Sequence, residues 1–293
     1  MTYFHKLPKK QLLTSVLALL GLVALPLSAS AKNTISITGS NTMMPINHKL
    51  ASEYAKINPH VKIEVESRGS ETGFKALINN ETDIAAASRE MTAQELYLFK
   101  EKTGTLPEKI VVTFDGIGVY VHSTNPVRQL TVSQLSRIMT GEIQNWQEVG
   151  GPDRKIDIFT RDTNSGTRTY MSSHVMHNHS LSDKALTVHS TDELAESVAR
   201  NQGAIGYGGI NYTQGANIIR LSENPGEKGV WPSRENLVNG KYPLSRPLMF
   251  YINPLSENKD IEDFIHWVQG PDGQLVVQSI GYPAQNFNTL AAN

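Results

Sequence analysis

The chain has 293 residues, a net charge of −1, 39% hydrophobic residues and 7% aromatic residues, values that are ordinary for a globular protein. This charge balance provides no overall positive field to attract nucleic acid or an anionic membrane, so a bound anion would need a local site. The chain has no cysteine, which excludes thiol catalysis, zinc–thiolate sites and lipid attachment at an N-terminal cysteine.

The first 31 residues have the pattern of a secretion signal. Lys6, Lys9 and Lys10 precede an uncharged apolar run over 11–25, and Ala-Ser-Ala at 29–31 matches the small-residue cleavage pattern. The run is too short and wrongly flanked for a good membrane span, although an uncleaved anchor is the alternative. We therefore expect cleavage after Ala31 and a periplasmic protein; because residues 1–31 hold three lysines and no acidic residue, its net charge would be −4.

Short strand-like runs alternate with helical patterns along the rest of the chain. The predicted strands are 34–39, 61–67, 82–87, 110–114, 156–160 and 204–207. The predicted helices are 45–56, 71–79, 93–101, 130–140, 167–176, 192–201, 260–269 and 273–280. Strands interleaved with helices in this way favour an α/β fold with a parallel sheet.

Two extended runs, 116–122 and 242–251, are bracketed by glycine or proline and are typical of crossings between two lobes. If the two runs pair, residues 32–117 and 248–293 form lobe 1, and residues 118–247 form lobe 2. Two crossings predict a hinge rather than a single linker.

Four predicted strand-to-helix turns, 39–42, 69–73, 88–89 and 161–167, carry small hydroxyl residues, glycine or arginine. Ligands of open α/β sheets bind at the carboxyl ends of strands, where helix N-termini offer free N–H donors and glycine allows close approach. Each turn alone is better explained by ordinary N-capping. Taken together, the four turns favour an anion site in a cleft.

Arg161 stands out in the last of these turns because its planar guanidinium fits two oxygens of a phosphate-like group. The alternative is a surface ion pair with Asp162. No nucleotide-binding loop and no GxSxG nucleophile elbow occurs in the sequence.

A histidine cluster, His174, His177 and His179, has a spacing that could bind zinc or copper. It falls at a predicted helix end, where Asp183 is the only nearby carboxylate. We therefore expect no metal site and no cofactor.

Several motifs, in order and spacing, resemble the phosphate-binding proteins of bacterial phosphate ABC transporters, the PstS family. The resemblance runs from about Thr34 to Tyr282. The motifs are GSNT (39–42), RGSETG (68–73), DIAAASRE (83–90), LTVSQLSRIMTGEIQNWQEVGG (130–151), TRDTNSGTRTYM (160–171) and GAIGYGG (203–209).

This resemblance implies a two-lobed periplasmic-binding-protein fold of type II that closes on one phosphate and delivers it to an ABC transporter permease. It implies a monomer that is not an enzyme and does not bind nucleic acid. The phosphate ligands that it implies are Ser40, Asn41, Thr42, Ser70, Ser88, Arg89, Arg161, Ser165, Gly166 and Thr167.

The chain departs from the family pattern at two positions. Arg89 occupies a place where many members have an aspartate that accepts the proton of hydrogen phosphate, and Asn41 replaces a hydroxyl. Glu71, Asp115 and Asp162 are candidate replacement acceptors, with Glu71 first because it follows Ser70 directly.

Two alternatives to phosphate transport remain at this point. A phosphatase on the same scaffold would need a nucleophile beside a base or a metal pair, and the sequence shows neither. An extracellular oxyanion-binding or adhesion protein would retain the anion site.

Overall fold

The computed structural model describes residues 1–3 and 33–285. The predicted signal segment lies outside the described residues apart from its first three. Among the described residues, no helix combines the length and the apolar character needed to cross a membrane.

The described strands join into one mixed sheet. Their bounds are β1 (Asn33–Gly39), β2 (Val61–Ser67), β3 (Ile84–Ala87), β4 (Glu108–Val121), β5 (Gln129–Thr131), β6 (Asp157–Arg161), β7 (Leu186–Val188), β8 (Ala204–Gly209), β9 (Asn217–Ser222) and β10 (Ser245–Ile252). The main order is β2-β1-β3-β10-β4-β8-β6-β7, and β9 pairs with both β4 and β5.

The expectation of a parallel sheet is correct for two groups of strands and wrong for the strands between them. β1 runs parallel to β2 and β3, and β6 runs parallel to β7 and β8. β10 is antiparallel to β3 and β4, and β4 is antiparallel to β8 and β9. β4 leads out of lobe 1 and β10 leads back into it, so these two strands run antiparallel where they pair.

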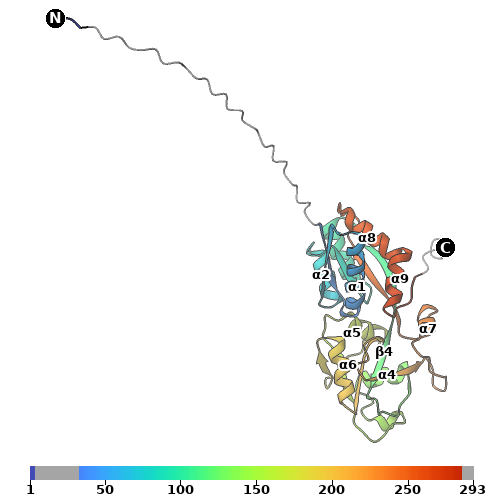
Figure 1. Cartoon of the computed structure of the whole chain (residues 1–293). Coiled ribbons are helices and arrows are strands. Elements are labelled where there is room, and N and C mark those ends of the chain that lie inside the picture. Colours follow the sequence, from blue (N-terminus) through green and yellow to red (C-terminus); the bar gives the residue numbers. More distant parts are fainter. Residues whose placement is uncertain (4–32, 286–293) are drawn as a thin grey trace. The chain divides into compact units, whose positions relative to one another are not determined.

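The helices gather in two groups around this sheet. Their bounds are α1 (Met44–Ile57), α2 (Ser70–Ile78), α3 (Ala93–Thr103), α4 (Val132–Met139), α5 (Gly166–Tyr170), α6 (Thr191–Arg200), α7 (Arg234–Val238), α8 (Lys259–Gln269) and α9 (Pro271–Ser279). Figure 1 shows α1, α2, α8 and α9 around one part of the sheet and α4, α5 and α6 around the other, with β4 running between them. The two-lobed α/β fold expected from the sequence is confirmed.

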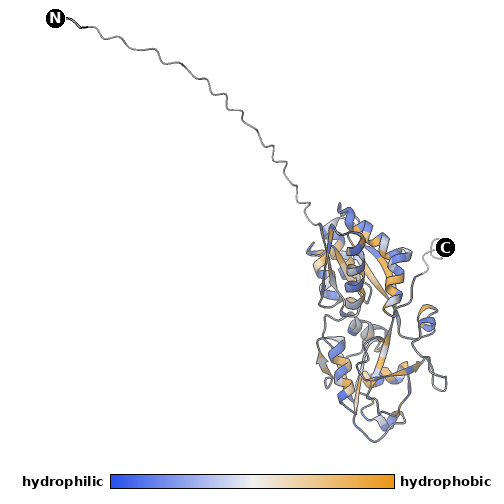
Figure 2. Cartoon of the chain, viewed as in Figure 1, coloured by the Kyte–Doolittle hydropathy of each residue, from blue (hydrophilic) through white to orange (hydrophobic). Residues whose placement is uncertain are grey.

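Strand β4 belongs to both lobes. Its first part, 108–116, pairs with β10, and its second part, 117–121, pairs with β8. Ile110 and Val112 pack into one hydrophobic core with α1 and α8, whereas Ile117 and Val119 pack into a second core with α4. In Figure 2, β4 is hydrophobic over much of its length. The sequence predicted a strand at 110–114 and a separate crossing at 116–122, which form one continuous strand.

Several short elements differ from the sequence expectation. β5, β7, β9 and α7 were not predicted, because elements of three to six residues are too short to show a reliable period. β5 occupies the first residues of the helix predicted at 130–140, so α4 begins only at Val132. The helix predicted at 167–176 is divided into α5 and a π-helical turn, Met171–Val175.

Gly39 ends β1 and directs the chain into the candidate site. Its φ is +148°, and an added Cβ would lie 2.0 Å from the backbone oxygen of Ala86 on β3. The next residue, Ser40, donates its N–H to that same oxygen at 2.8 Å. The turn therefore requires a residue without a side chain.

We predict that Gly39→Ala lowers the free energy of unfolding by about 2–4 kcal/mol, because it combines backbone strain with overpacking. Gly104→Ala is the matched control, since Gly104 also has a positive φ of +80° but an added Cβ there meets no atom within 4 Å. The control should lose only about 1–2 kcal/mol. Urea denaturation measures both, and equal losses would contradict the crowding at Gly39.

Candidate functional site

Five buried hydroxyl groups, contributed by both lobes, lie together where the two lobes meet. We call Ser40, Thr42, Ser70, Ser88 and Thr167 the hydroxyl cluster; none is more than 2% exposed. Those of lobe 1 follow β1, begin α2 or follow β3, and Thr167 comes from α5 of lobe 2. The cluster therefore lies at the carboxyl ends of strands, as expected for an α/β binding site.

The hydroxyls are connected to one another. Ser40 Oγ donates to Ser88 Oγ at 3.0 Å, and the backbone N–H of Ser88 donates to Ser70 Oγ at 3.1 Å. Thr42 Oγ1 and Thr167 Oγ1 lie 3.4 Å apart and bring the two lobes into contact. At Gly166, an added Cβ would lie 2.3 Å from Ser70 Oγ, so glycine permits this close approach.

Arg161, at the end of β6, is 3% exposed. Its Nη1 donates to Thr191 Oγ1 and its Nη2 donates to the backbone oxygen of His189, each at 2.9 Å, while its buried Nε has no hydrogen-bond partner. Burial lowers the pKa of the Arg161 guanidinium, nearby Asp162 opposes this, and the charge of Arg246 lowers it further. None of these hydrogen bonds goes to a carboxylate, so the buried charge lacks a directly bonded counter-charge.

Arg246, on β10, is a site residue that the sequence prediction missed. Its Nη1 donates to Thr167 Oγ1 at 2.9 Å and to the backbone oxygen of Ser88 at 3.2 Å. Its Nη2 donates to Thr42 Oγ1 at 3.3 Å and to Asp115 Oδ2 at 3.1 Å. One guanidinium thus contacts both lobes at the hydroxyl cluster. The sequence feature that could have identified Arg246 is that it is the single arginine within the apolar crossing at 242–251.

Asp115, on β4, is fully buried. Burial raises the pKa of its carboxyl group, and the guanidinium of Arg246 opposes that rise. Its second oxygen, Oδ1, has no hydrogen-bond partner. Of the three acceptors suggested by the sequence, Asp115 is the one bonded to a residue that contacts the hydroxyl cluster.

Arg89, Glu71 and Asp162 have partners away from the cluster. The guanidinium of Arg89 makes two hydrogen bonds of 2.7 Å to Glu95 and lies over the Phe74 ring. The carboxylate of Glu71 lies 2.6 Å from Lys75 Nζ on the same helix. Asp162 Oδ2 lies 3.7 Å from His189 Nδ1. The structure therefore does not bring the charged ends of Arg89 and Glu71 to the hydroxyl cluster.

The remaining predicted residues border the cluster. Asn41 precedes Thr42, and its buried Oδ1 has no hydrogen-bond partner. Ser165 Oγ accepts the N–H of Arg168 at 3.3 Å and so caps α5. Ser165 thereby holds the turn that presents Gly166 and Thr167.

The histidine cluster does not form a metal site in the structure. The ring of His174 stacks on Tyr170 with centroids 4.0 Å apart. Over residues 33–285, no group of three histidine, aspartate or glutamate side chains is arranged to hold a metal ion.

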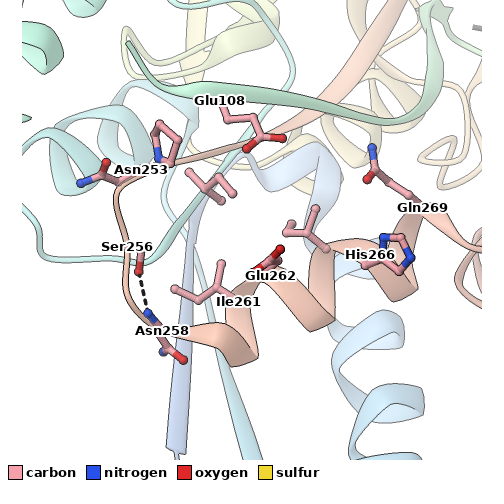
Figure 3. Close-up of a pocket in the computed structure, with 11 residues that line it drawn as sticks. Glu108, Asn253, Ser256, Asn258, Ile261, Glu262, His266 and Gln269 are labelled. Carbon is pink, nitrogen blue, oxygen red and sulfur yellow. Dashed lines mark hydrogen bonds between the residues drawn. The ribbon is translucent and has the colours of Figure 1, made fainter. Parts of the chain in front are cut away.

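Two cavities lie at different distances from the cluster. One, of about 500 Å³, is lined by Arg246, Tyr170 and Arg89 and adjoins the site. The other, of about 340 Å³, is lined by Glu108, Glu262 and their neighbours (Figure 3). Glu108 begins β4, whereas Asp115 lies seven residues further along the strand, so this second cavity is separate from the hydroxyl cluster.

The fold and the site define a two-lobed substrate-binding protein, and comparisons with known proteins agree. A family model described as the PBP superfamily domain matches residues 26–272. The chain is 32% identical over 260 residues to a phosphate-binding protein PstS of Staphylococcus epidermidis, covering 86% of this chain and 78% of the relative. It is 28% identical to PstS of Borreliella burgdorferi, covering 85% and 88%.

Solved structures give the same result. A protein of Clostridium perfringens, described as a phosphate ABC transporter substrate-binding protein with bound phosphate, superposes with a TM-score of 0.78 at 27% identity. The match covers 87% of this chain and all of that chain. This chain belongs to the PstS family of phosphate-binding proteins.

We predict that Gly166→Ala prevents full approach of the lobes, because the new methyl group would overlap Ser70 Oγ and approach Ser88 Oγ to 2.8 Å. Overpacking costs about 1–3 kcal/mol, which would shift the population toward an open form by roughly 5- to 150-fold. Small-angle scattering with saturating phosphate should show a larger radius of gyration than that of the wild type. Gly150→Ala is the control, since no atom lies within 4 Å of an added Cβ; equal radii for all three proteins would contradict the prediction.

Proposed function

We propose that this chain binds inorganic phosphate in the cleft between its lobes and delivers it to an ABC transporter permease. The observation that carries the proposal is the buried guanidinium of Arg161, which has no directly bonded carboxylate. A buried charge without a partner is costly, and an anion would supply the missing charge.

The donor set suits a tetrahedral oxyanion. Hydroxyls donate one hydrogen bond each, and a guanidinium donates two in a planar fork that matches two oxygens of one phosphate. The names of the curated relatives and the phosphate described in the Clostridium perfringens structure support phosphate as the ligand. We propose that the ligands are those predicted from the sequence, with Arg89 contributing through its backbone: Ser40, Asn41, Thr42, Ser70, Ser88, Arg161, Ser165, Gly166 and Thr167.

Binding would close the hinge. We assign residues 32–117 and 248–293 to lobe 1 and residues 118–247 to lobe 2, with β4 and β10 as the crossings. Because the proposed ligands come from both lobes, the closed form gains contacts with the anion that an open form lacks.

The cellular setting follows from the sequence pattern. The signal would be cleaved after Ala31, and the mature chain would act in the periplasm as a monomer. Its relatives are named as binding proteins, which supports a role in binding rather than in catalysis.

We predict that Arg161→Ala weakens phosphate binding by 100-fold or more. Charge-assisted hydrogen bonds contribute about 1.5–3 kcal/mol each, and Arg161 can make two of them to one anion. Isothermal titration calorimetry of the mature protein with phosphate measures the loss.

Arg200→Ala is the control for this prediction, because Arg200 belongs to the same lobe but is exposed and pairs with Glu196. The control should bind phosphate as the wild type does. A folded Arg161→Ala protein with wild-type affinity would remove Arg161 from the site.

A further inference from the structure

Arg246 and Asp115 form a buried ion pair where the two crossing strands meet. They are directly opposite each other in the antiparallel register of β10 and β4. The guanidinium and carboxylate lie 3.1 Å apart, and neither side chain is exposed. The sequence prediction gave Arg246 no role and named Asp115 only as a candidate proton acceptor.

We infer that Arg246 is the second cation of the anion site, acting from the hinge, and that Asp115 is the positioning residue that holds it there. This inference rests on the proposed function and deepens it. The resemblance implied Arg89 as a ligand, but the guanidinium of Arg89 is bonded to Glu95 instead.

The hydrogen bonds of Arg246 show how it would act. The guanidinium donates to Thr42 Oγ1 of lobe 1 and to Thr167 Oγ1 of lobe 2. A hydroxyl oxygen that accepts from a guanidinium keeps its own proton for a further bond, and the positive charge makes that proton a stronger donor. Arg246 therefore directs both threonines to donate, which is what an oxyanion between the lobes requires.

The position of Arg246 is held on several sides. Asp115 Oδ2 accepts from Nη2, and the backbone oxygen of Ser88 accepts from Nη1. The ring of Tyr170 lies below, with its centroid 5.9 Å from the guanidinium carbon. A single long side chain placed at a hinge would otherwise have many rotamers, so these contacts set the fork in one orientation.

Burial of an ion pair is not in itself strongly stabilising, because the cost of desolvating two charges offsets their attraction. A purely structural pair at the hinge would affect folding and leave the affinity of the folded protein for phosphate unchanged. A pair that orients the donors would affect phosphate affinity, and the two substitutions would not act independently.

The experiment is a double-mutant cycle on the mature chain, with Arg246→Lys, Asp115→Asn and the double variant titrated with inorganic phosphate by calorimetry. Arg246→Lys should weaken binding 100-fold or more, because an ammonium lacks the planar fork that reaches both threonines. Asp115→Asn should weaken binding about 10-fold. The double variant should bind about as weakly as Arg246→Lys alone.

Thermal melting without phosphate serves as the folding control. Asp157→Asn is the matched substitution, since Asp157 is a lobe 2 carboxylate paired with Lys155; it should leave affinity unchanged. If Arg246→Lys does not fold, the near-isosteric Asp115→Asn decides the question, and a folded Asp115→Asn protein with wild-type affinity would overturn the inference.

The same phosphate titrations distinguish a failure of this inference from a failure of the proposed function. Wild-type protein that binds no phosphate would overturn both. Wild-type protein that binds phosphate, together with a folded Arg246→Lys variant of equal affinity, would overturn only the role of Arg246.

Discussion

A guanidinium and a carboxylate buried between β10 and β4 connect the hinge of this protein with its candidate anion site. Arg246 and Asp115 face each other because the two crossing strands pair antiparallel at this point. From there the guanidinium contacts Thr42 on one lobe and Thr167 on the other. The strands that join the lobes therefore also set the distance and direction of the hydrogen-bond donors between the lobes. The fold and the candidate site thus depend on the same pairing of β10 with β4.

The site concentrates positive charge locally in a chain that is acidic once residues 1–31 are excluded. Arg161 and Arg246 are both buried, and burial together with the charge of Arg246 lowers the pKa of Arg161. Two neighbouring buried cations are unfavourable on their own, and Asp115 is directly bonded only to Arg246. A multiply charged anion would offset the remaining charge, and the surrounding hydroxyls would satisfy its oxygens without adding charge.

Much of the fold was predictable because its strands and helices have clear periods and its turns carry glycine and hydroxyl residues. The residues of the hydroxyl cluster were all found in this way. Arg246 was missed because its importance depends on the register that places it opposite Asp115, and periodicity does not determine which residues of two strands are paired.

For two predicted site residues, Glu71 and Arg89, the sequence contains a local pattern that indicates the partner of the side chain. Glu71 and Lys75 are four residues apart on a helix, a spacing that favours an ion pair. Thr92 and Glu95 form a capping box that places the Glu95 carboxylate beside Arg89. In contrast, Arg161 and Thr191 belong to segments that are distant in the sequence. Their hydrogen bond could therefore be recognised only in the three-dimensional structure.

The most direct test of the account is a crystal structure of the mature chain grown with arsenate, whose arsenic atom can be located by anomalous scattering and whose shape matches phosphate. We predict one arsenic peak between the lobes, with the arsenate oxygens within hydrogen-bond distance of Arg161 and the hydroxyl cluster and with the guanidinium of Arg246 bonded to Thr42 and Thr167. An arsenic peak only in another cavity, such as the one lined by Glu108 and Glu262, would contradict it, as would a closed structure with no arsenic between the lobes.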